Sequence, residues 1–341
     1  MNDDRNKSAP PMRRLFVVSC ALLLAAVLSR PQFAVTIWQD AAAAGSIGSA
    51  NGQPRDVSPV KSGDPSMIGT NVCDRIVNVD GMKIHLLEWG DPGRPTLVLL
   101  HGIARVAHTF DHLAPYYAKE RHVVAIDMRG HGDSAWDPQA QYTVEDYTKD
   151  VAGVITQLGL RDIVLWGNST GGRVVQMIGG TMPERVKAVI VEDVGPERPA
   201  EVSNRRASRM AVEAAGWATE EELAAHIRRD YPRTRPALLE NFVRHGSMRN
   251  ADGRIVLKRD PAILKGFTPT ELWDTVRRVR APIIYILGGA STIVPQETQT
   301  KLREVLPQVQ IVTMPGLGHY PSDEEPEAFR VIVDEFLAKI R

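Results

Sequence analysis

Short apolar runs alternate with stretches of helical periodicity from Arg75 to the end of the chain. Such runs, bounded by polar turn residues, are typical of strands that are buried on both faces of a parallel sheet. Two strands at the start, 75–79 and 83–89, flank Asp80-Gly81, a turn that predicts an antiparallel hairpin. The other predicted strands are 96–100, 123–127, 163–166, 188–192, 283–287 and 310–314.

Helical stretches lie between these strands. An antiparallel start followed by repeated strand–helix units implies a mostly parallel sheet with helices on both faces. We therefore predict an α/β fold with an eight-stranded sheet. The helices predicted in the core are 108–117, 144–158, 172–179, 296–306 and 326–340.

The alternation is interrupted once, between Asp193 and Ala281, where no comparable strand signal occurs and helical periodicity dominates. An insertion of this length between two core strands predicts a helical cap over residues 194–281. The core is then formed by residues 71–193 and 282–341. The best helix candidates in the insertion are 203–215, 219–230, 235–245 and 269–279.

The N-terminal region differs in composition from the rest. A polar segment ending in Arg13-Arg14 precedes an apolar run, 15–28, that is too short to span a bilayer and is typical of an export signal. Small residues at 41–44 suit cleavage, so residues 1–44 are predicted to export the protein to the periplasm or the medium. The alternative is an uncleaved anchor, extended by 33–38, through which alone the chain would contact a membrane.

Residues 45–70 are rich in Gly, Ser, Pro, Asn and Asp, which predicts a flexible linker. The whole chain has 41 basic and 41 acidic residues, so nothing in its charge indicates nucleic acid as a partner. Its two cysteines are Cys20, inside the apolar run, and Cys73. Cleavage of the signal would leave Cys73 alone and exclude an intramolecular disulfide.

The strongest chemical signal is Gly167-Asn168-Ser169-Thr170-Gly171, which follows a predicted strand and opens a predicted helix. Small residues at both ends allow a sharp turn, so that the Ser169 hydroxyl projects from the edge of the sheet as a nucleophile. The helix N-terminus adds partial positive charge beneath a developing anion.

A serine hydroxyl needs an adjacent base, and His319 is the candidate because it directly follows the last predicted strand. Loops that leave one edge of a parallel sheet converge, which can bring His319 to Ser169. In His101-Gly102-Ile103, the glycine lets the backbone turn beneath the nucleophile. The backbone amides of Ile103 and Thr170 are then predicted to form an oxyanion hole.

From about Arg75 onward, the chain resembles the α/β-hydrolase superfamily, and within it the cap-bearing group of esterases, C–C hydrolases and haloalkane dehalogenases. Dehalogenases and many epoxide hydrolases of this group have an aspartate at the turn, whereas this chain has Ser169, which points to acyl transfer. The charged residues Asp127, Arg129 and Asp133 are expected to organise a loop. The stretches that carry the resemblance are 100–102, 127–134, 167–172 and 318–319.

One departure from the superfamily concerns the acid of the triad. Most relatives carry it in a pattern such as G-x-x-D-x-I-V-P, but this chain has Gly-Gly-Ala-Ser-Thr-Ile-Val-Pro at 288–295. Some relatives place the acid at the end of the preceding core strand, where Asp193 aligns best and its neighbour Glu192 should point to the other side. The alternatives are Glu192 as the acid, or no acid, with Asp193 serving only the turn into the cap.

These residues predict a hydrolase without metal or cofactor that acts on a small-molecule carbonyl substrate: an ester, lactone or thioester. The catalytic residues would be Ser169, His319 and Asp193. Two alternatives stay open. The same scaffold could perform C–C bond hydrolysis or cofactor-free peroxidation, or the chain could be a slow-turnover binding protein or receptor, which the missing acid after residue 287 favours.

Overall fold

The computed structural model describes residues 72–197, 208–210, 213–264 and 270–340. The predicted export signal, the predicted linker and most of the helix predicted at 203–215 lie outside the described residues. Within the described part of the chain, no helix combines the length and the apolar character needed to cross a bilayer.

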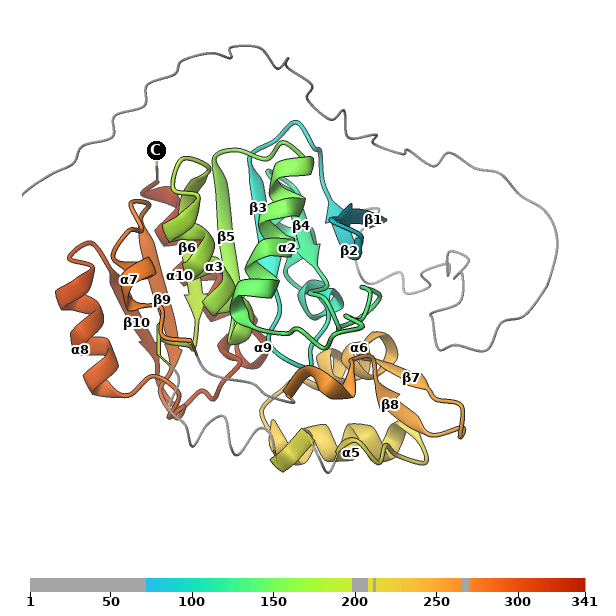
Figure 1. Cartoon of the computed structure of the whole chain (residues 1–341). Helices are drawn as coiled ribbons and strands as arrows, with labels where there is room; N and C mark the ends of the chain where they lie inside the picture. Colours follow the sequence, from blue (N-terminus) through green and yellow to red (C-terminus); the bar gives the residue numbers. More distant parts are fainter. Residues whose placement is uncertain (1–71, 198–207, 211–212, 265–269, 341) are drawn as a thin grey trace, which may run out of the picture. The chain divides into compact units, whose positions relative to one another are not determined.

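An eight-stranded, mostly parallel sheet forms the core, as predicted (Figure 1). Its spatial order is β1-β2-β4-β3-β5-β6-β9-β10. Strand β2 pairs antiparallel with β1 and β4, and all other neighbours in the sheet pair in parallel. The strands are β1 (Cys73–Val79), β2 (Met82–Trp89), β3 (Thr96–Leu100), β4 (His122–Ile126), β5 (Ile163–Asn168), β6 (Val186–Glu192), β9 (Ile283–Gly288) and β10 (Gln310–Met314).

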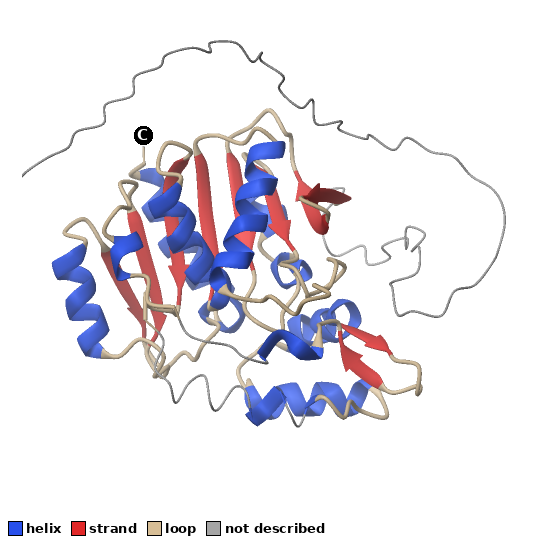
Figure 2. Ribbon diagram, in the orientation of Figure 1, coloured by secondary structure: helices blue, strands red, loops and turns tan. Residues whose placement is uncertain are grey.

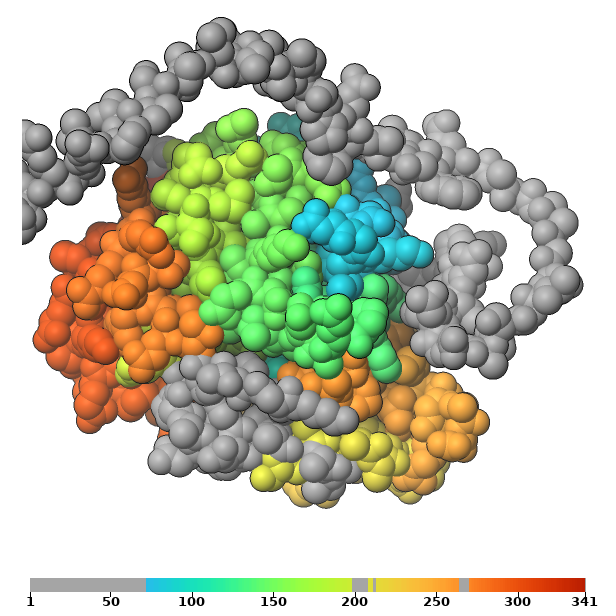
Figure 3. Space-filling model, in the orientation of Figure 1, coloured from blue at the N-terminus to red at the C-terminus, as the bar shows by residue number. Residues whose placement is uncertain are grey.

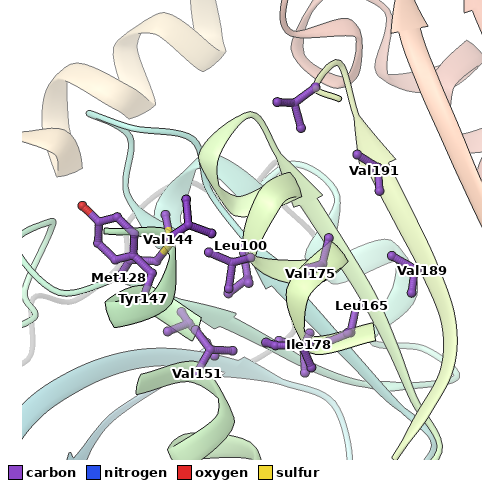
Figure 4. Close-up of a cluster of buried hydrophobic side chains, with 14 of the residues drawn as sticks. Leu100, Met128, Val144, Tyr147, Val151, Leu165, Val175, Ile178, Val189 and Val191 are labelled. Carbon is purple, nitrogen blue, oxygen red and sulfur yellow. The ribbon is translucent and has the colours of Figure 1, made fainter. Parts of the chain in front are cut away.

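Helices cover both faces of this sheet (Figure 2). On one face, α2 (Val144–Gln157) and α3 (Thr170–Thr181) pack on alternate residues of the strands. Figure 4 shows this layer, in which Leu100, Leu165 and Val189 of the sheet meet Val151 and Ile178 of the helices. On the other face, the intervening strand residues contact α10 (Pro326–Ala338). Burial on both faces explains why the strands read as continuous apolar runs.

The predicted core helices differ from the observed ones mainly at 108–117. Instead of one helix, a 3-10 turn η1 (Ala107–Phe110) is followed by a single α-helical turn, α1 (Ala114–Tyr117). Pro115 lies in the first turn of α1, where its missing N–H is tolerated, whereas in the interior of one continuous helix that N–H would be needed for a backbone hydrogen bond. The remaining core helices are α8 (Gln296–Val305) and α9 (Pro321–Glu324). The helix predicted at 269–279 at the end of the insertion is the single turn α7 (Trp273–Val276), whose Trp273 and Val276 belong to the same buried cluster as the residues of α3.

The insertion contains α5 (Glu220–Asp230) and α6 (Pro236–Gly246), close to the helices predicted at 219–230 and 235–245. It is not entirely helical: β7 (Ser247–Arg249) and β8 (Ile255–Leu257) form a small antiparallel sheet, followed by the 3-10 turn η2 (Pro261–Leu264). The sequence contains no sign of this hairpin, although it predicted the two helices beside it. The yellow and orange residues of α5, α6 and this hairpin group together in Figure 3.

Candidate active site

The turn from β5 to α3 holds Ser169 in a strained backbone conformation, with φ 51° and ψ −117°. Such strain in a non-glycine residue is typical of functional sites. The turn is also tight, because a Cβ atom on Gly171 would overlap the carbonyl oxygen of Leu100 in β3. The amide of Gly171 donates to the carbonyl of His101 (3.1 Å), which ties the start of α3 to the loop after β3.

His319 lies in the loop between β10 and α9, beside the end of β5. The Asn168 side-chain amide donates to the His319 carbonyl oxygen (3.3 Å). The imidazole Nδ1 lies 2.7 Å from Oδ2 of Asp193. Because ionised carboxylates only accept hydrogen bonds, this contact assigns the proton to Nδ1 and leaves Nε2 as the basic nitrogen.

Asp193 directly follows β6 and, like Ser169, has a positive φ, 47°. Its amide donates to the Ile286 carbonyl of β9 (3.0 Å), so the residue is anchored where β6 and β9 end side by side. The buried carboxylate accepts the Gly288 amide at Oδ1 (3.0 Å) and the Ser291 hydroxyl at Oδ2 (2.5 Å). These donors satisfy carboxylate oxygens that are buried away from water.

Glu192, the last residue of β6, binds different partners. Its carboxylate accepts the Ser322 amide (2.9 Å) and the indole N–H of Trp166 (3.2 Å). Complete burial raises the pKa of Glu192 to about 7, although the hydrogen bonds from Ser322 and Trp166 act in the opposite direction. The carboxylate that contacts His319 is thus that of Asp193.

The backbone amides of Ile103 and Thr170 flank Ser169 from the loop after β3 and from the first residue of α3. Neither amide has a hydrogen-bond partner among the residues that the structure describes. Thr170 is buried, and Ile103 lines a cavity together with Arg105, Tyr320 and cap residues.

Arg105 was not singled out by the sequence analysis, yet it joins three parts of the site. Its guanidinium forms a buried ion pair with Asp323 in α9 (2.9 Å). It lies 4.1 Å from the ring centre of Tyr320, the residue after His319, and 5.0 Å from that of Phe242 in the cap helix α6. The contact between Arg105 and Asp323 spans 218 positions in the chain, so no local pattern could reveal it.

Ser291 was also missed as a site residue, although it occupies the position where the superfamily pattern has its acid. Its hydroxyl reaches the carboxylate that contacts His319. The absence of a carboxylate at this position was the only signal in the sequence.

The charged residues of the loop after β4 have structural contacts, as expected. Asp127 accepts the amides of Ala107 (2.6 Å) and Asp133 (3.1 Å) and binds His85 (2.7 Å). Arg129 binds both carboxylate oxygens of Asp150 (2.5 and 2.7 Å). Burial opposes protonation of His85, but its hydrogen bonds to Asp127 and Asp74 raise its pKa to about 9.

Three groups of histidine and acidic side chains in the described residues are close enough to share a metal ion. Members of each group also form ion pairs: His108 with Asp111 (2.9 Å), His85 with Asp127, and Glu213 with Arg259 outside its group (2.6 Å). The three groups are His108, Asp111 and His245; His85, Asp127 and Asp133; and Glu213, His226 and Asp230.

A model of the alpha/beta hydrolase family matches residues 97–331. The chain belongs to this family. The hydrolase is 28% identical to the sn-1-specific diacylglycerol lipase ABHD11 of Mus musculus over 280 residues, which cover 75% of this chain and 85% of that relative. It is 26% identical to the esterase Rv0045c of Mycobacterium tuberculosis over 276 residues, covering 76% and 87% of the two chains.

Among solved structures, E-2-(acetamidomethylene)succinate hydrolase superposes with a TM-score of 0.72 at 24% identity, over 79% of this chain and all of that one (100%). That likeness concerns the fold. Together with the family match, it confirms the α/β-hydrolase fold that the sequence predicted, and the named relatives confirm that the chain is an enzyme of the hydrolase class.

Proposed function

We propose that this hydrolase cleaves an ester, lactone or thioester through an acyl-enzyme on Ser169. The observation that carries the proposal is the contact between His319 Nδ1 and Asp193 Oδ2 at the sheet edge where the strained turn holds Ser169. A nucleophile, a base and a group that orients the base are the parts that acyl transfer requires.

In the proposed reaction, Ser169 Oγ attacks the substrate carbonyl carbon while His319 Nε2 accepts the hydroxyl proton. The amides of Ile103 and Thr170 donate to the oxyanion of the tetrahedral intermediate. His319 then gives the proton to the leaving group, whose bond to the carbonyl carbon breaks. His319 Nε2 then takes a proton from water, which attacks the acyl carbon and forms a second tetrahedral intermediate. The bond between Ser169 Oγ and the acyl carbon breaks, His319 returns the proton to Oγ, and the acid is released.

Asp193 serves in this scheme as the triad acid. By accepting the Nδ1 proton it keeps the imidazole in the tautomer that exposes Nε2, and its charge stabilises the imidazolium that forms during the reaction. Glu192 is less suited to this role because its carboxylate is bound by Ser322 and Trp166. The contact of Asp193 with His319 also weakens the case for a slow-turnover receptor, which depended on a missing acid.

Hydrolysis of short p-nitrophenyl esters tests the proposal. The wild type is expected to turn over, Ser169→Ala to retain its fold but lose turnover, and His319→Ala to be nearly as inactive. Because triad members act as a unit, the double variant should be no worse than either single variant. Ser208→Ala, which removes an exposed serine, is the matched control and should match the wild type. Near-normal turnover by folded Ser169→Ala would overturn the proposal.

A further inference from the structure

The loop after β9 brings a serine to the position that carries an acid in the pattern G-x-x-D-x-I-V-P. Ser291 is half-buried there, and its amide donates to the Gly288 carbonyl (3.0 Å), which closes a tight turn directly after the strand. The proposed triad does not use this residue. Its side chain nevertheless points at the triad.

The hydroxyl of Ser291 donates to Oδ2 of Asp193 (2.5 Å), the same oxygen that lies 2.7 Å from His319 Nδ1. The Ile293 amide donates to Ser291 Oγ (3.3 Å). A hydroxyl that accepts from an amide directs its own proton elsewhere, here to the carboxylate. Hydrogen bonds from a hydroxyl to an ionised carboxylate are short and strong.

The loop that presents Ser291 is tied to the loop that presents His319. The Ala290 amide donates to the Leu317 carbonyl (2.8 Å), and the Gly289 amide donates to the Met314 carbonyl at the end of β10 (2.8 Å). Ser291 and His319 therefore approach Asp193 from two segments whose backbones are hydrogen-bonded to each other. The position of the hydroxyl relative to the imidazole is set by main-chain contacts.

We propose that Ser291 is a positioning residue of the triad, whose hydroxyl holds Asp193 Oδ2 against His319 Nδ1. This inference rests on the proposed roles of Ser169, His319 and Asp193. The Gly288 amide holds Oδ1, and Ser291 supplies the second fixed donor, so the carboxylate cannot rotate away from the imidazole. Ser291 occupies the position where the superfamily pattern has its acid. It thus holds Asp193, the acid that follows the neighbouring strand β6.

The test compares Ser291→Ala and Ser291→Thr with the wild type in kcat and KM of p-nitrophenyl ester hydrolysis. Ser291→Ala is expected to lower kcat about tenfold, the size that one hydrogen bond to a charged group supports. Its KM should stay nearly unchanged, because Ser291 does not line the substrate-binding part of the site in this account. Ser291→Thr, which keeps the hydroxyl, should recover most of the lost kcat.

Thr292→Ala is the matched control, because Thr292 is the exposed neighbour in the same loop, and it should behave as the wild type. If the kcat of Ser291→Ala equals that of Thr292→Ala, Ser291 has no positioning role. If Ser291→Ala unfolds, Ser291→Thr decides: a folded threonine variant with near-wild-type kcat supports the inference, and one with the loss expected for alanine overturns it.

Labelling of Ser169 by a fluorophosphonate separates this inference from the proposed function. A wild type that is not labelled at Ser169 refutes the nucleophile and the inference with it. A labelled wild type, combined with an equal labelling rate in Ser291→Ala, refutes only the role of Ser291. A labelling rate about tenfold lower in Ser291→Ala supports the positioning role of Ser291, even if the enzyme cleaves p-nitrophenyl esters poorly.

Discussion

Glu192 and Asp193 are consecutive residues whose carboxylates bind different partners. Asp193 contacts His319 and Ser291, whereas Glu192 contacts Trp166 and Ser322. The two acids are thereby separated into one that faces the proposed base and one that is enclosed beside α9. Each consequence of this separation can be measured.

The first consequence concerns turnover. Asp193→Asn should lower kcat by up to about 10⁴-fold, because an amide cannot stabilise the imidazolium and can impose the wrong tautomer. Glu192→Gln should cost far less, since Glu192 does not contact His319. Steady-state kinetics on both variants, with thermal unfolding as the check on folding, decide between them. A larger loss in Glu192→Gln would identify Glu192 as the acid, and unchanged kcat in both would mean that no buried acid is needed.

The second prediction concerns a double variant in which the carboxylate is moved from position 193 to position 291. Ser291 Oγ lies 2.5 Å from Asp193 Oδ2, so a carboxylate at position 291 would lie near the imidazole. Adding Ser291→Asp to Asp193→Asn should therefore raise kcat at least about tenfold above that of Asp193→Asn alone, since it restores charge stabilisation of the imidazolium. Thr292→Asp in the same background is the control and should give no recovery. Equal recovery by both variants would show a general charge effect.

The third prediction concerns stability and pH. The pKa of Glu192 is raised from its usual value near 4.5 to about 7, so the folded state binds this proton more tightly than the unfolded state. The resulting stability is present in full below about pH 4.5 and is lost as pH rises through 7. Between pH 5 and pH 8 the wild type should lose up to about 3 kcal/mol more unfolding free energy than Glu192→Gln.

Urea unfolding across this pH range measures the difference. Glu304→Gln, at an exposed position, is the control and should follow the wild-type curve. Because the comparison uses the slope against pH, any constant cost of the glutamine side chain cancels. Parallel curves for wild type and Glu192→Gln would mean that Glu192 does not titrate in this range.

The fourth prediction concerns the buried ion pair between Arg105 and Asp323 (2.9 Å). Arg105→Ala would leave the Asp323 carboxylate buried without its partner and should cost about 3–5 kcal/mol of unfolding free energy. Arg235 and Glu327 form an exposed pair, and Arg235→Ala should cost less than about 1 kcal/mol. Similar losses in the two variants would show that burial of the pair has no effect on stability.

Much of the fold could be predicted because strands buried on both faces leave continuous apolar runs, as at β3, β5 and β9. The hairpin β7–β8 could not, because its strands are three residues long and their pairing depends on the turn at Gly253 (φ 76°). The start of η1 could not be placed from the sequence, because the Ala107 amide binds Asp127, which follows the end of another strand.

The site residues likewise fall into those that the sequence predicts and those that it does not. Ser169 and His319 were predicted from local motifs next to strands, and Asp193 from its place at the end of one. The contacts of Ser291 with Asp193 and of Arg105 with Asp323 join segments that are distant in sequence and have no periodic pattern. Only the arrangement of the loops in space brings these side chains together.

The most direct test of the central claim is to trap the acyl-enzyme. Wild-type protein is mixed with p-nitrophenyl acetate, quenched in acid during turnover, digested and analysed by mass spectrometry. The account predicts an acetyl group on Ser169, absent in Ser169→Ala and retained in Ser208→Ala. Continued turnover with Ser169 unmodified, together with undiminished turnover by Ser169→Ala, would contradict it.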